Sequence, residues 1–211
     1  MLTFNRLVTL GCSFTYGEEL SNPQEQAWPS LLSKAFEIDL LNLAKPGYSN
    51  DHIMNNLLEV DLCPNDLVVV GFAPFNRILF ENEEGWFTTI PNFYKESKNE
   101  LITQVFKNTS IDFLIKRFLV QIVYVQTLLD KKNTKWLFFN PSTNLRQSDN
   151  IQKYSYLTNQ IDPNRFWGWP YYCWLDLIGD EKVMPKGHPT SVHHIHLSKI
   201  FADKIKLLYD I

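Results

Sequence analysis

Paired cysteines are absent from this sequence of 211 residues. Its three cysteines, Cys12, Cys63 and Cys173, are odd in number and widely spaced, and none belongs to a C-x-x-C pair. This pattern excludes a disulfide framework and favours a reducing compartment. Because the apolar run in the N-terminal segment MLTFNRLVTLGCSF is too short for a signal peptide, we expect a cytoplasmic protein.

An excess of basic residues is also missing. The formal net charge is −3 and the isoelectric point is about 5.9. Nucleic acids and anionic membranes are bound by clusters of Lys and Arg, and a solvated helix end explains the mild cluster at Lys131, Lys132 and Lys135. We therefore expect neither nucleic acid nor a membrane as a partner, and the sequence leaves the oligomeric state open.

Long uninterrupted apolar runs are missing too. The longest apolar-rich stretch, residues 111–129, is interrupted by charged and amide side chains, so it predicts a buried or amphipathic helix and not a membrane span. With 45% hydrophobic and 20% charged residues, the chain has the composition of an ordinary globular protein. No internal repeat or low-complexity linker divides it, so we expect a single domain over residues 1–211.

Short apolar runs and helical patterns alternate along the chain. Four runs rich in branched apolar residues predict buried strands at Leu7–Leu10, Leu40–Leu43, Asp66–Phe72 and Trp136–Phe139. Four helical patterns lie at Trp28–Glu37, Asn50–Val60, Ile111–Lys131 and Ser191–Tyr209. The predicted strands do not alternate between polar and apolar residues, which is typical of a parallel sheet covered on both faces. The order of elements predicts an α/β fold, a three-layer α/β/α sandwich with a mostly parallel sheet.

Two of the predicted helices carry further local signals. The first has Pro29 just after its start, where the missing backbone N–H costs nothing. The last has an apolar stripe that consists of Val192, Ile195, Ile200, Ile205 and Leu208, with Lys199, Asp203 and Lys206 on the solvated side. We expect this stripe to pack against the sheet.

Two stretches depart from the alternation. Residues 77–100 predict a hairpin or lid insertion with a turn around Glu83–Gly85. Residues 141–187 predict no further strand–helix unit but contain the aromatic segment RFWGWPYYCWLDL. For Trp167 and Trp169, a sugar-stacking wall and an anchor to the sheet both remain open, whereas for Trp174 we favour the anchor.

The segment VTLGCSFTYG places a serine directly after the first predicted strand. Ligands of open α/β sheets bind beyond the carboxyl ends of the strands, so Ser13 lies at that edge, although a serine there can also simply cap a helix. The loops after the second and third strands supply three candidate donors, the Gly47 backbone N–H and the Asn76 and Arg77 side chains. A serine between loops of donors suits acyl transfer, because the donors stabilise negative charge on the tetrahedral oxygen.

A nucleophilic serine needs a base, and four of the five histidines lie in the segment GHPTSVHHIH. His188 lies in the loop before the final helix and is the candidate base, whereas the other histidines lie within helices and are expected to be packed or solvated. His193 and His196 suggest a metal site, but no Asp, Glu or Cys completes a ligand set, so we predict no metal and no cofactor. Cys12, an alternative nucleophile, is expected to point into the core.

Three blocks of the sequence resemble the SGNH/GDSL hydrolase superfamily. GCSFTYG is similar to the first block, G-D-S-x-T-x-G, with Ser13, Thr15 and Gly17 matching, while NLAKPGYSND and GHPTSVHHIHLSKI resemble the second and last blocks. The resemblance implies a flavodoxin-like α/β/α fold and hydrolysis of an ester or thioester without a metal. It also implies that Ser13 is the nucleophile, that His188 is its base, and that the backbone N–H groups of Ser13 and Gly47 are the oxyanion donors.

The first and third blocks each depart from the family pattern. Cys12 replaces the first-block Asp, a position outside the catalytic roles. The third block of the family reads G-x-N-D, but this sequence has Ala73 at the asparagine position, which cannot donate a hydrogen bond from its side chain. Asn76 is the substitute that position suggests, and Arg77 could also fill the space.

The last block lacks its usual carboxylate. Pro185 stands three residues before His188, where the family has the Asp that orients the histidine. The alternative partners for the His188 ring are Asp176, Asp180, Glu181 or a backbone carbonyl. Loss of the orienting carboxylate can cost about 10⁴-fold in rate in a conventional triad, so this departure bears on activity more than on fold.

Two functions follow from these patterns. The first is an SGNH-like serine esterase that cleaves a small acyl ester, with an O-acyl carbohydrate as one candidate substrate. The second is a binding or structural module that keeps the fold but has lost efficient catalysis. A His188 ring within hydrogen-bond reach of the Ser13 Oγ, with a polar partner behind the ring, would favour the enzyme.

Overall fold

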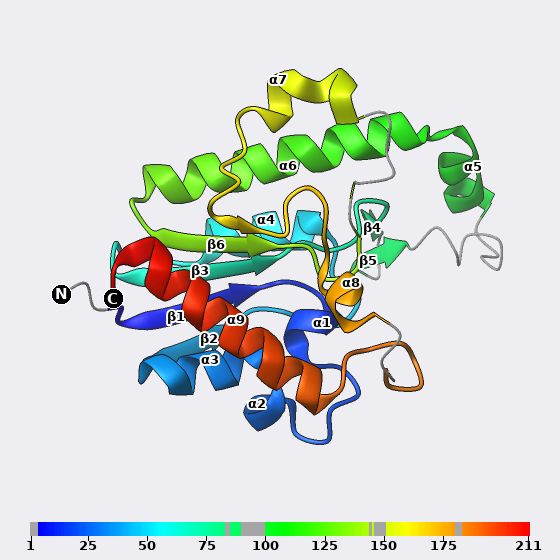
Figure 1. Cartoon of the computed structure of the whole chain (residues 1–211). Coiled ribbons are helices and arrows are strands. Elements are labelled where there is room, and N and C mark those ends of the chain that lie inside the picture. The colour runs from blue at the N-terminus through cyan, green and yellow to red at the C-terminus, as the bar shows by residue number, and fades with distance from the viewer. Residues whose placement is uncertain (1–3, 83–84, 90–99, 144, 146–150, 180–182) are drawn as a thin grey trace.

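The computed structural model describes residues 4–82, 85–89, 100–143, 145, 151–179 and 183–211. Its centre is a five-stranded sheet in the order β2-β1-β3-β6-β7, in which every neighbouring pair is parallel (Figure 1). The strands are β1 (Arg6–Leu10), β2 (Asp39–Asn42), β3 (Asp66–Gly71), β6 (Lys135–Phe139) and β7 (Phe166–Trp167). The four strands predicted from apolar runs are confirmed, and β7 is an addition.

The helices α3 (Trp28–Phe36) and α9 (Ser191–Tyr209) cover one face of this sheet, and α4 (Asn50–Glu59) and α6 (Ile111–Lys131) cover the other (Figure 1). In β3, Val68 and Val70 pack toward α4 and α6, whereas Leu67 and Val69 pack toward α3 and α9. A strand covered on both faces must be apolar throughout, because successive side chains point to opposite faces. The predicted three-layer sandwich is therefore confirmed.

Local signals determine where these helices begin. Ser110 caps α6 by accepting a hydrogen bond from the Phe113 N–H at 3.1 Å. Thr190 caps α9, where the Thr190 N–H donates to His193 Nδ1 at 3.0 Å. Each such cap contributes about 1 kcal/mol, so the helix boundaries follow from nearby residues. Although α6 has 21 residues, no helix within the described ranges is both long and apolar enough to cross a bilayer.

The apolar stripe predicted for α9 is partly wrong. Val192 and Ile195 are 67% and 44% exposed. The buried face instead consists of His193, His194, Leu197, Ser198, Phe201, Ala202 and Ile205. His194 lies on this face, where its Nδ1 accepts a hydrogen bond from the Trp28 N–H of α3 at 3.1 Å. The predicted solvated residues Lys199, Asp203 and Lys206 are exposed.

The strand β7 and the helix α8 (Trp174–Ile178) lie in the segment for which the sequence predicts no further strand–helix unit. β7 pairs with β6 through two residues, Phe138 with Phe166 and Phe139 with Trp167. A strand this short leaves no periodic signal in the sequence. Trp174 is buried in the core beneath α3 and α9, as expected of an anchor.

Shorter elements fill the remaining connections. The helices are α1 (Ser13–Tyr16), α2 (Pro23–Gln26), α5 (Glu100–Asn108) and α7 (Ser155–Thr158), with a 3₁₀ helix at Ile151–Tyr154. β4 (Ile78–Asn82) and β5 (Gly85–Thr89) pair antiparallel in a separate two-stranded sheet. Within the predicted insertion over 77–100, residues 83–84 of the turn and residues 90–99 lie outside the described residues. A lid role and a single domain over the whole chain stay predictions.

Candidate active site

Ser13 is the first residue of α1, directly beyond the carboxyl end of β1, and its side chain is buried. α1 is one turn long, and Gly17 ends it in the left-handed conformation (φ 86°) with its N–H bonded to the Ser13 carbonyl at 2.9 Å. Thr15 packs against bare backbone, since a Cβ on Gly11 would overlap its Oγ1 and one on Gly71 would lie 2.7 Å from it. The glycines therefore let the serine turn lie directly on the ends of β1 and β3.

His188 lies in the loop before α9. Its ring packs against Phe14, the residue after Ser13, with the two ring centroids 5.4 Å apart. The His188 carbonyl accepts a hydrogen bond from the Met184 N–H at 2.8 Å, which closes the turn that carries the ring. The first and last sequence blocks, which come from opposite ends of the chain, therefore meet at the carboxyl edge of the sheet.

Two acidic side chains flank the His188 ring. Glu19 Oε2 lies 2.7 Å from Nδ1, and Glu18 Oε2 lies 3.4 Å from Nε2. The backbone N–H of Lys186 donates to both carboxylate oxygens of Glu19, at 3.1 and 3.2 Å. Burial alone would raise the pKa of Glu19, but its hydrogen bonds with His188 and Lys186 outweigh that effect and lower the pKa. Glu19 is therefore a carboxylate at neutral pH.

The sequence did not predict Glu18 or Glu19 as partners of the base. Of the residues that it did suggest, Asp176 accepts a hydrogen bond from the Cys173 N–H at 2.7 Å at the start of α8. Asp180 and Glu181 lie outside the described residues. The signal that was available is the acidic pair in YGEEL, which directly follows the serine turn and so starts at the same edge of the sheet.

The predicted nucleophile, the Ser13 Oγ, and its base, the His188 ring, are not hydrogen bonded to each other in the described part of the chain. Nε2 of the ring faces Glu18. The polar partner behind the ring is present, on Nδ1, but the serine contact on the other side is not. The geometry thus meets one of the two conditions that would favour an enzyme.

Gly47 and Asn50 shape the loop that follows β2. Gly47 has φ 79°, and no atom would lie within 4 Å of a Cβ at this position, so its backbone is open to an approaching ligand. Asn50 is buried and holds the loop after β3, because its Nδ2 donates to the Ala73 carbonyl at 3.0 Å and its Oδ1 accepts from the Ala73 N–H at 2.8 Å. Two hydrogen bonds therefore join the loop after β2 to the loop after β3. They join it at Ala73, the position at which the SGNH/GDSL family has its third-block asparagine.

Asn76 and Arg77 follow β3 and belong to a second polar cluster. Arg77 Nη1 donates to the Tyr48 carbonyl at 2.9 Å, and the Arg77 carbonyl accepts from Arg117, which forms an ion pair with Asp51. The Arg77 Nε and the Asn76 Oδ1 are buried, and the described part of the chain gives neither a hydrogen-bond partner. Arg77 thus braces the second loop, and an oxyanion role for either residue stays a prediction.

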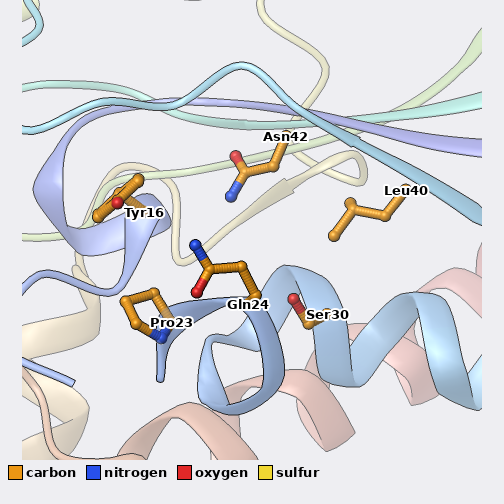
Figure 2. Close-up of a pocket in the computed structure, with 6 residues that line it drawn as sticks. All are labelled: Tyr16, Pro23, Gln24, Ser30, Leu40 and Asn42. Carbon is orange, nitrogen blue, oxygen red and sulfur yellow. The ribbon is translucent and has the colours of Figure 1, made fainter. Parts of the chain in front are cut away.

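A pocket of about 210 Å³ opens beside the end of α1 (Figure 2). Its lining comes from α1, α2, α3 and β2 and consists of Tyr16, Pro23, Gln24, Ser30, Leu40 and Asn42. Asn42 Oδ1 accepts hydrogen bonds from the Thr9 hydroxyl at 2.9 Å and the Ala44 N–H at 3.1 Å, which turns the amide nitrogen toward Gln24 (Figure 2). The predicted site residues do not line this pocket, so it lies beside the serine turn and not over it.

A larger pocket, of about 390 Å³, lies between the end of β7 and α8. It is lined by Trp167, Gly168, Tyr172, Asp176 and Leu177. α8 connects it to the serine turn, because Trp174, the first residue of α8, packs edge-on against Phe14 at 6.0 Å. The pocket combines aromatic faces with a carboxylate, a combination that suits a polyhydroxylated ligand.

The histidines within α9 have structural contacts. His193 caps the helix, as described above, and His196 is exposed. His194 is fully buried, and burial lowers its pKa to about 3, with His193 and His188 adding to the shift, so the ring is neutral. Among the described residues, no group of three or more His, Cys, Asp or Glu side chains could hold a metal ion. Cys12 lies fully buried in the core, as predicted.

Comparison with known proteins gives matches in structure but not in sequence. The sequence matches no protein-family model and no curated protein. The structure of TesA covers 97% of this chain and 99% of its own at 14% identity, with a TM-score of 0.59. The psychrotrophic esterase EstA from Pseudoalteromonas sp., inhibited by monoethylphosphonate, covers 98% and 100% at 13% identity and a TM-score of 0.56. A carbohydrate esterase family 2 enzyme from Corynascus thermopiles covers 98% and 67% at 13% identity and a TM-score of 0.57. At these identities the likeness shows the fold.

Proposed function

We propose that this chain, which has the fold of the SGNH/GDSL hydrolases that its sequence blocks resemble, is a serine esterase that cleaves a small acyl ester. The observation that carries the proposal is the meeting of the first and last blocks. The His188 ring packs against Phe14, beside Ser13, and has a carboxylate on its Nδ1. A base beside the serine, with a polar partner behind it, is the arrangement that activates a hydroxyl.

In the proposed reaction, the Ser13 Oγ attacks the acyl carbon while its proton passes to Nε2 of His188. The negative charge on the tetrahedral oxygen is stabilised by the backbone N–H groups of Ser13 and Gly47. The Ser13 N–H lies in the first turn of α1, where backbone N–H groups have no partner inside the helix. His188 then gives the proton to the departing alcohol, and a water molecule releases the acid by the same route. Asn76 and Arg77 are proposed to line the substrate side.

An O-acyl carbohydrate is the substrate class that we propose for this reaction. The pocket between β7 and α8 supports it, since Trp167 and Tyr172 offer aromatic faces and Asp176 offers a hydrogen-bond acceptor for sugar hydroxyls. One matched structure, the enzyme from Corynascus thermopiles, is itself a carbohydrate esterase. The pocket would hold the alcohol portion of the ester while the acyl group lies at Ser13.

A binding module without efficient catalysis is the second candidate, and two observations favour it. Nε2 of His188 faces Glu18 instead of Ser13, and Ala73 occupies the position of the third-block asparagine. In this case the site would retain its ligand without cleaving it. Ser13→Ala would then leave ligand binding intact.

Hydrolysis of p-nitrophenyl acetate by the wild type, Ser13→Ala and His188→Ala tests the first proposal. We expect both variants to lose about 10³-fold or more in kcat/KM while keeping the wild-type circular dichroism spectrum and melting temperature. A fluorophosphonate should label the wild type and not Ser13→Ala. Hydrolysis that survives both substitutions would contradict the esterase, and a folded wild type that neither hydrolyses the ester nor reacts with the fluorophosphonate would support the binding module.

A further inference from the structure

The contact between Glu19 and His188 is the shortest that the His188 ring makes with a charged group. Glu19 Oε2 lies 2.7 Å from Nδ1, within the range of a charge-assisted hydrogen bond. Both side chains are largely buried, with exposed fractions of 13% for His188 and 11% for Glu19. A hydrogen bond shielded from water holds the ring in one orientation, because neither partner can readily exchange it for a solvent molecule.

The Glu19 carboxylate is itself held from a second direction. The Lys186 N–H donates to both of its oxygens, and Lys186 lies two residues before His188 in the same loop. The Glu19 backbone has φ 70°, a left-handed conformation that few residues other than glycine adopt. A conformation of this kind persists only where the surroundings enforce it. Both ends of the contact are therefore fixed before any substrate arrives.

We propose that Glu19 is the positioning residue for His188, in the role that an Asp at position 185 would otherwise have; this rests on the proposed esterase function. An Nδ1–H donated to Glu19 leaves Nε2 as the unprotonated nitrogen, which is the tautomer that a general base requires. When Nε2 takes the Ser13 proton, the imidazolium forms beside the Glu19 carboxylate. The carboxylate stays ionised throughout, and the proton leaves with the alcohol.

Glu18 does not meet the same requirements. Its Oε2 lies 3.4 Å from Nε2, the nitrogen that must remain accessible to the serine proton, and its side chain is 31% exposed. It lies on the opposite side of the ring, where a carboxylate, which only accepts hydrogen bonds, can pair with Nε2 only after that nitrogen has taken a proton. Glu18 is therefore the matched control for Glu19, since both are glutamates beside the same ring and a change to Gln removes one negative charge in either case.

The test compares Glu19→Gln, Glu19→Asp and Glu18→Gln with the wild type in p-nitrophenyl acetate hydrolysis. We expect Glu19→Gln to lower kcat by about 10²–10⁴-fold with KM changed little, because Glu19 contacts the ring at Nδ1 and not at the nitrogen that takes the proton. Glu18→Gln should cost at most a few-fold. Glu19→Asp should recover part of the rate lost in Glu19→Gln. Urea unfolding of each variant identifies a loss that comes from misfolding.

Nitrogen-15 spectra of the histidine rings provide a readout that does not depend on activity. In the neutral ring, the wild-type His188 should show the tautomer protonated at Nδ1, and Glu19→Gln should shift the neutral ring toward the other tautomer. An unchanged tautomer, or a kcat in Glu19→Gln within a few-fold of the wild type, would overturn the proposal. If the wild type proves inactive, the esterase function fails, and the tautomer still decides whether Glu19 positions the ring.

Discussion

Two histidines near the start of α9 are placed in opposite surroundings. His188 lies in the loop before the helix, between the carboxylates of Glu18 and Glu19. His194 lies one turn into the helix, where its Nδ1 accepts the Trp28 N–H and its ring meets Trp174 edge-on at 4.8 Å. The first ring has a carboxylate oxygen within 3.4 Å of each of its two nitrogens. The second is fully buried, and burial disfavours the charged form of its ring.

The difference shows how position decides whether a histidine can take part in chemistry. A base must be able to gain and lose a proton during the reaction, and neighbouring carboxylates make that gain favourable. A histidine that only accepts a backbone hydrogen bond serves best when it stays neutral, as His194 does. The sequence segment GHPTSVHHIH contains both kinds, and the place of His188 in the loop before the helix already sets it apart from His194 in the sequence.

The largest expected effect is the difference in esterase activity between a variant that lacks the His188 ring and a variant that lacks the His194 ring. We expect His188→Gln to lower kcat/KM for p-nitrophenyl acetate by about 10³-fold or more, because the serine loses its base. His194→Leu should keep most of the wild-type activity per folded molecule, since the His194 ring is hydrogen bonded to the Trp28 N–H of α3. Equal losses in the two variants, measured at a temperature where both are folded, would remove the distinction.

His194→Leu should show the second-largest effect, on stability. The substitution leaves the buried Trp28 N–H without its acceptor, which costs about 1–3 kcal/mol in the free energy of unfolding. Urea titration followed by tryptophan fluorescence measures this loss. His196→Leu is the control, because His196 is exposed on the same helix and its replacement should stay within about 0.5 kcal/mol. A similar cost for both variants would argue against the buried hydrogen bond.

The pH dependence of stability should also differ between wild type and His194→Leu. The pKa of His194 is lowered from 6.5 to about 3 in the folded protein. Between these two pH values the unfolded chain binds a proton at His194 and the folded chain does not. The contribution to stability is therefore complete above about pH 6.5 and is lost as the pH falls toward 3, at up to about 1.4 kcal/mol per pH unit. Urea titrations at several pH values should show a shallower decline in His194→Leu. Parallel curves would mean that His194 is not the group responsible.

The smallest effect is expected at Val192, which lies between the two histidines. Val192 is 67% exposed, so Val192→Lys should change the free energy of unfolding by no more than about 0.5 kcal/mol. The hydrophobic pattern of the sequence placed this residue in the buried stripe and would predict a large loss. A melting temperature that falls by many degrees in Val192→Lys would show that Val192 is buried, as the hydrophobic pattern predicts.

The sheet could be predicted from the sequence because its rule is local. The central residues of β3 must be apolar when helices cover both faces, and the four residues LVVV within DLVVVG show that directly. The predicted stripe of α9 missed the buried face, although Leu197, Phe201 and Ile205 of that face recur every four residues. The hydrogen bond between His194 and Trp28 in its first turn could not be predicted, because these residues are far apart in the chain. β7 could not either, since two residues become a strand only through their pairing with β6.

Some residues of the candidate site could likewise be proposed from the sequence, and Glu19 could not. Ser13, Gly47 and His188 could be proposed from the sequence because the end of each strand and the start of the last helix are readable from local patterns. Glu19 could not, because its side chain reaches His188 from a left-handed backbone conformation (φ 70°) that no sequence pattern announces. The contact between Glu19 and His188 depends on how the loop after α1 and the loop before α9 run past each other, and the sequence does not specify that path.

The paired hydrogen bonds between Asn50 and Ala73 have a consequence for the end of β3. The Phe72 N–H still donates to the Phe139 carbonyl of β6 at 3.0 Å, and at the next residue the Asn50 amide takes over as donor and acceptor. A carboxamide has the same two hydrogen-bonding groups as a peptide unit, so Asn50 serves as a one-residue splint that replaces an absent strand neighbour. The chain therefore leaves the sheet from a fixed point, and solvent exchange of the Ala73 amide proton should be as slow as that of the strand before it.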